Sequence, residues 1–128
     1  MTAIGHLKTR SEFLHVKGGT RFATPSLVLQ ARRRAVTSGH ALDLARFGFT
    51  ATRSLGGAVI RNRARRRIKE AVRLSGPAHA AKGYDYVLIA RGGTVQRPFN
   101  ELIEDLERAL AKVHDPSSAK TRRKSKTD

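Results

Sequence analysis

The sequence has no cysteine and no tryptophan, and its aromatic side chains are limited to five Phe and two Tyr. Without cysteine, a disulfide framework and a thiolate metal site are both excluded. No apolar run approaches the ~20 residues that a membrane-spanning helix needs, and the first residues lack the apolar stretch of a signal peptide. These absences predict a cytoplasmic protein with no membrane partner.

Acidic residues are also scarce. Ten Asp and Glu face 26 Lys and Arg in 128 residues, which gives a net charge of +16 and a pI near 11.6. Such an excess opposes compaction by self-repulsion, so a fold retains it only where a polyanion is usually nearby. We therefore expect a nucleic-acid partner, and the charge leaves open whether the free protein needs anions or salt to fold fully.

The usual arrangements of catalytic residues are missing as well. The five histidines are scattered, with no pair at i, i+4, so no protein-borne metal site is expected. Gly56-Gly57 is not followed by the G-K-[ST] of a phosphate-binding loop, and no Ser-His-Asp set or buried carboxylate pair is visible. The histidines are His6, His15, His40, His79 and His114.

The order of hydrophobic patterns predicts one small α+β domain over residues 1–114. We expect a mixed sheet of about three to four strands with helices packed on it, in α-β-β-α-β-α order. Residues 115–128 cannot bury apolar surface and are predicted to form a disordered basic tail. The expected elements are a helix from the capping box Thr9–Glu12 to Gly18-Gly19, a strand at 25–30, a surface turn at 32–40, a strand at 46–52, a helix at 58–74, a strand at 84–90 and a helix at 98–113.

Three further predictions concern particular side chains. Gly76-Pro77 is expected to stop the long helix. The Phe47–Phe49 and Tyr84–Tyr86 pairs alternate along strands and are assigned to the core. The acids of the last helix are expected to face water; they are Glu101, Glu104, Asp105 and Glu107.

The helix at 58–74 carries the strongest functional signal. Its segment 61–73 holds six Arg and one Lys against one acid, Glu70. At helical spacing, Ile60, Ala64, Ile68 and Ala71 form a stripe that docks on the sheet, bordered by Val72. The opposite side holds Asn62, Arg66, Lys69 and Arg73. A merely solvated helix would alternate signs at i, i+4, whereas repeated positive charge favours binding of phosphates.

Residues 56–70, Gly-Gly-Ala-Val-Ile-Arg-Asn-Arg-Ala-Arg-Arg-Arg-Ile-Lys-Glu, resemble the signature of the bacterial ribonuclease P protein family. That signature is a G-N-A-V-x-R-N-R-x-[RK]-R core that follows a strand. The resemblance extends from about Leu7 to His114 and includes the early helix with Phe13, the flanking strands and the closing helix.

The resemblance implies a role in 5′ maturation of tRNA. In that family an RNA subunit with bound Mg²⁺ cleaves the 5′ leader from precursor tRNA, and the protein assists without catalytic residues or a further protein partner. It also implies a left-handed β-α-β crossover, contrary to the usual preference. The residues that it assigns to the RNA subunit are Arg53, Arg61, Asn62, Arg63, Arg65, Arg66, Arg67 and Lys69, to which we add Arg73; those for the single-stranded leader are Phe13, Val28 and Gln30, with Lys17 beside them.

This sequence departs from the family pattern at two sites. Gly57 stands where the family usually has Asn, and Arg53-Ser54 replaces a Lys-Lys pair. Where relatives often carry two further aromatics in the leader cleft, this chain has Lys17 and Gln30. Since stacking on a base contributes ~1–3 kcal/mol, we expect leader contact here to depend more on charge and hydrogen bonds.

Other functions remain open from the residues alone. A ribosomal or other structural RNA-binding protein would show the same charge and size without any effect on cleavage. A protein-only nuclease should show clustered acids or a histidine pair, and a DNA-binding module should show a recognition-helix turn before the basic helix.

Overall fold

The computed structural model describes residues 1–35 and 43–115, which form five strands packed between helices. The sheet order is β1-β4-β5-β3-β2. Pairs β1–β4 and β4–β5 are parallel, while β3–β5 and β2–β3 are antiparallel. The sheet is therefore mixed, as predicted, with more strands than expected. The strands are β1 (Ala3–His6), β2 (Thr20–Ala23), β3 (Leu27–Arg33), β4 (Leu44–Thr50) and β5 (Tyr84–Ala90).

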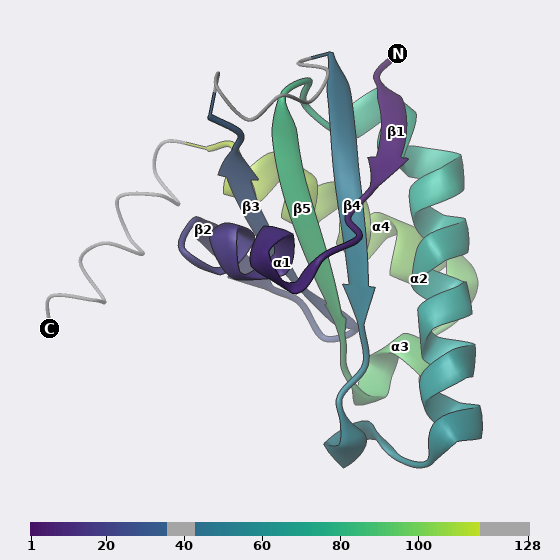
Figure 1. Cartoon of the computed structure of the whole chain (residues 1–128). Helices are drawn as coiled ribbons and strands as arrows, with labels where there is room; N and C mark the ends of the chain where they lie inside the picture. The colour runs from purple at the N-terminus through teal and green to yellow at the C-terminus, as the bar shows by residue number, and fades with distance from the viewer. Residues whose placement is uncertain (36–42, 116–128) are drawn as a thin grey trace, which may run out of the picture.

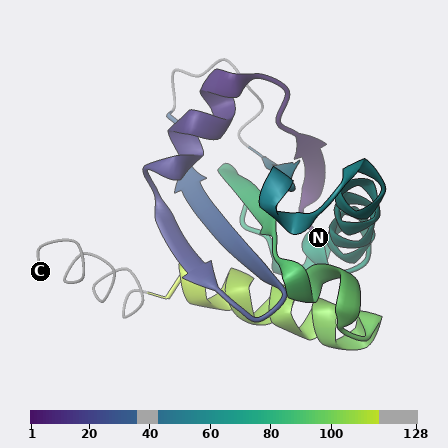
Figure 2. The same cartoon turned by 90° about the horizontal axis from the view of Figure 1, so that it is seen from below.

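The helices lie on both faces of the sheet. Figure 1 looks onto the face that carries α1, and Figure 2 shows α1 and α4 on opposite sides of the sheet. Helix α2 packs with α4 against the larger hydrophobic core. The helices are α1 (Arg10–Lys17), the 3-10 turn η2 (Arg53–Leu55), α2 (Ala58–His79), α3 (Gly92–Gln96) and α4 (Phe99–Val113).

The connection from β4 through α2 to β5 is left-handed. The two strands are parallel neighbours. In Figure 1 both run downward with β5 to the left of β4, and α2 returns on the far side of the sheet. A right-handed crossover would place β5 on the other side of β4. The handedness agrees with what the family resemblance implied.

Alternation along the strands divides their side chains between two cores. Phe47 and Tyr86 are fully buried between the sheet and helices α2 and α4, and their ring centroids lie 4.7 Å apart. A smaller cluster of Leu7, Val16 and Val87 holds α1 on the other face. The assignment of the Phe47–Phe49 and Tyr84–Tyr86 pairs to structural packing is confirmed.

Strands β1 and β2 were absent from the sequence prediction. Each has four residues, too few for a clear alternation. Strand β1 forms through contacts with distant residues: it pairs with β4, and the Thr2 N–H donates to the Pro77 carbonyl at 2.8 Å. Such pairing leaves no signal in a local window.

Helix α2 does not stop at Gly76-Pro77 as predicted but continues to His79. Proline removes one N–H donor, while the following turn still forms, since the Ala80 N–H donates to the Gly76 carbonyl at 2.8 Å. A Cβ on Gly76 would lie 3.1 Å from Val72 and 3.5 Å from Ile4. The missing side chain thus lets β1 approach the helix, and that contact supports its last turn.

Two predicted surface positions are buried. The first is Arg34, which is 4% exposed and donates to Asp85 and to two backbone carbonyls. Its neighbours Arg32 and Arg33 belong to β3 and not to a turn. Asp105 is 2% exposed; it accepts from Ser26 Oγ at 2.7 Å and forms an ion pair with Arg97, whose Nε lies 2.9 Å from a carboxylate oxygen. Both corrections have one cause, because a buried charge is stable only with polar partners. Arg34 contacts Asp85 and Asp105 contacts Ser26, each in a segment distant in the sequence. The rest of the predicted turn and the tail from residue 116 lie outside the described residues.

Candidate nucleic-acid interface

The outward side of α2 carries an uninterrupted set of exposed polar and cationic side chains. Asn62, Arg66, Lys69 and Arg73, hereafter the outward row, are all exposed, as predicted from helical spacing. Ala64, Ile68 and Ala71 are fully buried on the other side. Ile60, predicted to join that buried stripe, is 44% exposed, because the first turn of α2 extends beyond the ends of the strands (Figure 1).

The predicted RNA contacts on α2 separate into two groups. Val59, Asn62, Arg65, Arg66 and Lys69 line one shallow hollow, where Arg65 donates to the Asn62 side-chain oxygen. Arg63 is exposed nearby on the helix. Arg61 is half-buried, and Arg67 donates to the Arg97 carbonyl with its guanidinium 5.7 Å from the centroid of the Phe99 ring. Arg67 therefore contacts the segment around α3 and α4 in addition to any ligand.

One member of the outward row has a local acidic partner. Arg73 forms a bidentate pair with Glu70, with oxygen–nitrogen distances of 2.6 and 2.8 Å. The hydrogen bond from Arg73 lowers the pKa of Glu70, and the pKa of Arg73 is raised in turn. The charge of Arg73 is thus partly compensated before any phosphate arrives.

The start of α2 adds further positive potential. Its N-cap, Gly57, provides no side-chain capping bond, and Arg53 is exposed on the preceding 3-10 turn. The free N–H groups of a helix N-terminus favour anions. A Cβ at Gly57 would meet nothing within 4 Å, so its backbone is open to a ligand.

The predicted leader residues lie around α1 and the sheet face beneath it. Phe13 is half-buried and Lys17 is exposed on α1, whereas Val28 and Gln30 on β3 are only 6% and 8% exposed. Because the β3 residues offer little accessible surface, the exposed groups of α1 provide most of what a ligand could contact here.

Gly48 determines how closely α1 approaches the sheet. A Cβ on this residue would lie 2.5 Å from two atoms of the Phe13 ring. Any larger residue at this position of β4 must displace the ring. Gly48 therefore determines the position of Phe13, one of the predicted leader residues, although the sequence interpretation did not single it out.

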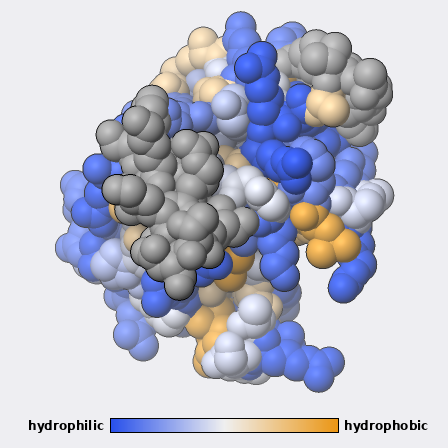
Figure 3. All heavy atoms as spheres, turned by 90° about the vertical axis from the view of Figure 1, so that its left-hand side faces the viewer, coloured by the Kyte–Doolittle hydropathy of each residue, from blue (hydrophilic) through white to orange (hydrophobic). Residues whose placement is uncertain are grey.

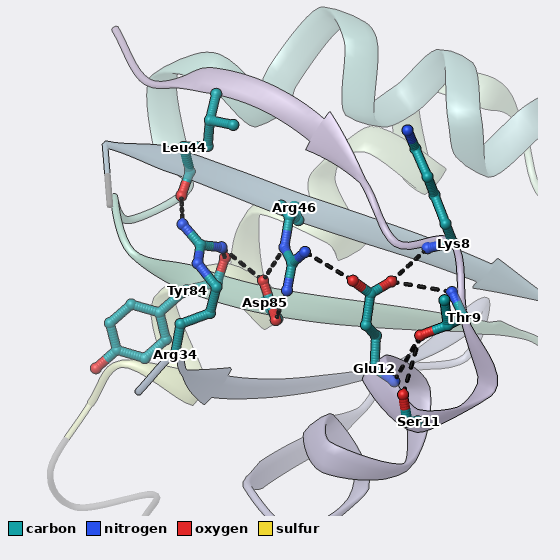
Figure 4. A network of polar contacts seen from close by, with 9 residues as sticks. All are labelled: Lys8, Thr9, Ser11, Glu12, Arg34, Leu44, Arg46, Tyr84 and Asp85. Carbon is teal, nitrogen blue, oxygen red and sulfur yellow. Dashed lines mark hydrogen bonds and ion pairs between the residues drawn. The ribbon is translucent and has the colours of Figure 1, made fainter. Parts of the chain in front are cut away.

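A buried ion-pair network joins α1 to the centre of the sheet (Figure 4). Asp85 on β5 accepts from Arg34 at 2.6 Å and from Arg46 at 2.9 and 2.7 Å. Arg46 also donates to Glu12 on α1 at 2.8 Å. Sequence reasoning missed this network, but a lone acid within the most apolar strand was a usable signal, because a buried carboxylate requires partners.

Glu12 connects the network to the start of α1. Its other oxygen accepts from the backbone N–H groups of Lys8 at 2.6 Å and Thr9 at 2.9 Å, which completes the predicted capping box. These two backbone hydrogen bonds, together with Arg46, lower the pKa of Glu12 to about 2 from its ordinary value of 4.5.

The lowered pKa predicts an acid-sensitive position for α1. Because the carboxylate is favoured by the fold, its stabilising contribution is fully present above about pH 4.5 and is lost as the pH falls toward 2. We expect Glu12→Gln to lower the free energy of unfolding at pH 7, with a smaller difference from wild type at pH 3. Urea unfolding at both pH values measures this, with exposed Glu104→Gln as the control. An unchanged difference at pH 3 would contradict it.

Away from α2, the described surface includes a mainly polar side. Figure 3 shows the side of the molecule nearest β2, which is mainly hydrophilic with small hydrophobic patches. Over residues 1–35 and 43–115, no helix is long and apolar enough to span a membrane. Within those same ranges, no group of three His, Asp or Glu side chains is arranged to hold a metal ion.

Comparison with known proteins gives consistent matches along most of the chain. The family model described as Ribonuclease P matches residues 1–114. The chain is similar to the ribonuclease P protein component of Ruegeria pomeroyi, with 45% identity over 116 residues and 90% of each chain covered. It is 48% identical over 108 residues to the same component of Gluconacetobacter diazotrophicus, covering 84% of this chain and 89% of that protein.

Solved structures match the fold. The ribonuclease P protein of Thermotoga maritima superposes with a TM-score of 0.64 at 26% identity, covering 80% of this chain and 96% of that one. The protein of Staphylococcus aureus gives a TM-score of 0.66 at 25% identity, with 86% and 97% covered. The solved relatives thus share the arrangement of sheet and helices.

Proposed function

Because the chain belongs to the ribonuclease P protein family, we propose that its two faces hold two different RNA segments. The exposed side of α2 binds the catalytic RNA subunit. The surface formed by α1 and the adjoining sheet binds the single-stranded 5′ leader of precursor tRNA. The comparisons are with ribonuclease P proteins, so the ribosomal alternative has no support among them.

The observation that carries this proposal is the set of cations on α2 without acidic partners. Arg63, Arg66 and Lys69 are exposed, and no salt bridge to them is found among the described residues. Like charges at i, i+3 slightly destabilise an isolated helix, and bound phosphates would offset that repulsion. Guanidinium groups bind phosphate in a bidentate manner, which suits an RNA backbone.

The proposal also divides the chemistry between RNA and protein. In our proposal the RNA subunit binds the Mg²⁺ that cleavage requires, and the protein contributes no catalytic residue. Its cations neutralise phosphates that would otherwise repel one another, so the RNA reaches its active conformation at lower Mg²⁺. Contact with the leader then favours precursor over product, since mature tRNA lacks that segment. The proposal places this activity in the cytoplasm and needs no further protein partner.

A cleavage assay tests the proposal. Precursor tRNA is incubated at low Mg²⁺ with a bacterial ribonuclease P RNA, with and without this protein. We expect the protein to restore cleavage at the mature 5′ end, and expect log K for RNA binding to fall with log salt by ~0.7–0.9 per phosphate neutralised. Binding to the RNA with no gain in cleavage would contradict the proposed role.

The leader assignment requires a separate comparison. Precursor with a leader and the same tRNA without one are titrated with the protein–RNA complex. A preference for the precursor that depends on the protein supports leader contact, whereas equal affinity would leave only the contact with the RNA subunit.

A further inference from the structure

A groove of about 550 Å³ lies between β1 and α2, and Phe49 of β4 is among the residues that line it. Its volume is within the range of ~300–1,000 Å³ that is typical of small-molecule sites. Ile4, Phe49, Val72 and Pro77 provide its apolar surface, and Arg66, Lys69 and Arg73 provide cations along one side. None of the residues assigned to the leader belongs to this groove.

The walls of the groove are fixed by hydrogen bonds between Thr2, the residue before β1, and the end of α2. The Thr2 N–H donates to the Pro77 carbonyl at 2.8 Å, and the Thr2 hydroxyl donates to the Ala80 carbonyl at 2.9 Å. Strand β1 is also paired with β4 on its other side. The groove therefore exists before any ligand arrives, which reduces the entropy lost on binding.

The chemistry of the groove matches a nucleotide. The Phe49 ring lines the groove, and the Lys69 ammonium group lies over it, 5.9 Å from its centroid. Arg73 is paired with Glu70, whereas Arg66 and Lys69 have no salt bridge within the described part of the chain. An aromatic platform beside unpaired cations is the combination that binds single-stranded nucleic acid, by stacking bases and neutralising phosphates.

We propose that this groove binds one unpaired nucleotide of the RNA held by α2. The base lies against Phe49 and Ile4, while Arg66 and Lys69 bind the flanking phosphates. The inference rests on the proposed function in that both use the outward row of α2. It adds a site that recognises a base, where the row alone recognises only phosphates.

Short RNA probes separate base binding from phosphate binding. The full-length protein is titrated with a labelled adenosine pentaribonucleotide and with an abasic ribose-phosphate pentamer of equal charge. Since stacking of one base contributes ~1–3 kcal/mol, we expect the adenosine probe to bind about 5- to 150-fold more tightly. Amide resonances of residues 3–5 should shift with the adenosine probe alone.

Three variants locate the effect. Phe49→Leu keeps an apolar side chain and should reduce the preference for adenosine by about 5-fold or more. Phe22→Leu removes a half-buried ring from β2, outside the groove, and should leave the preference unchanged. Lys69→Gln should weaken binding of both probes alike.

Either of two results would overturn the groove as a base site. One is equal binding of the two probes to the wild type; the other is an unchanged preference in folded Phe49→Leu. If that variant fails to fold, the amide shifts of the wild-type protein decide. If the protein still stimulates cleavage normally despite such a result, only the groove is rejected as a base site. If the protein does not stimulate cleavage, the proposed function itself is rejected.

Discussion

Replacing Arg63, Arg66 and Lys69 together with alanine is expected to weaken binding to ribonuclease P RNA by about 10²- to 10³-fold. A net contribution of ~1–1.4 kcal/mol from each contact, the value of a typical hydrogen bond and suited to exposed side chains, leads to this range. The three side chains are exposed and free of salt bridges within residues 1–35 and 43–115. The free energy of unfolding should therefore change by only ~0.5 kcal/mol or less per site.

A salt titration distinguishes specific contact from net charge. Loss of three phosphate contacts should reduce the slope of log K against log salt by ~2–3. The matched control is Arg33→Ala/Lys82→Ala/Lys112→Ala, which removes the same charge from exposed sites outside α2. Filter binding of both variants over a range of salt gives the comparison. Equal losses in the two triple variants would show that RNA responds to total charge, and the assignment to α2 would fail.

Asp85→Ala is expected to lower the free energy of unfolding by ~3–5 kcal/mol, the usual consequence of removing one partner from a buried ion pair. Asp85 is 1% exposed and accepts from two arginines that are themselves buried. Without it, Arg34 and Arg46 remain in the interior with their charge uncompensated. Because small domains are stable by only ~5–15 kcal/mol, much of the population would unfold under mild conditions.

Urea unfolding at neutral pH measures this effect. Glu104→Ala removes an equal charge from an exposed position of α4 and should change the midpoint little. Since added salt screens self-repulsion but does not replace a buried partner, the deficit of Asp85→Ala should persist at high salt. A loss below ~1 kcal/mol would mean that water or neighbouring carbonyls compensate the two guanidinium groups.

The sequence predicted the elements whose signals are local. Helix α2 and its buried stripe follow from the spacing of Ala64, Ile68 and Ala71, and the capping box of α1 follows from Thr9 and Glu12. Both depend on residues within one or two turns, where helical periodicity is reliable. The exposed side of α2 could be predicted for the same reason.

What the sequence did not predict depends on distant contacts. Arg34 resembles a surface residue until Asp85 is placed beside it across the sheet. Asp105 belongs to a set of acids on α4, of which Glu104 is exposed, and its contacts with Ser26, Arg97 and Arg108 explain its burial. The groove between β1 and α2 is likewise a product of pairing between residues near 3 and 44. The handedness of the crossover was available only through the family resemblance.

The buried network also determines when α1 can dock during translation. Glu12 is translated early, but its partner Arg46 follows 34 residues later, and Asp85 follows Arg46 by another 39. Helix α1 therefore cannot dock permanently until β5 has left the ribosome, although its own eight residues were complete long before. Contacts with such long sequence separation form slowly. During this interval the nascent chain exposes both α1 and α2, so under the proposed function RNA meets the α2 surface before the surface proposed for the leader has been assembled.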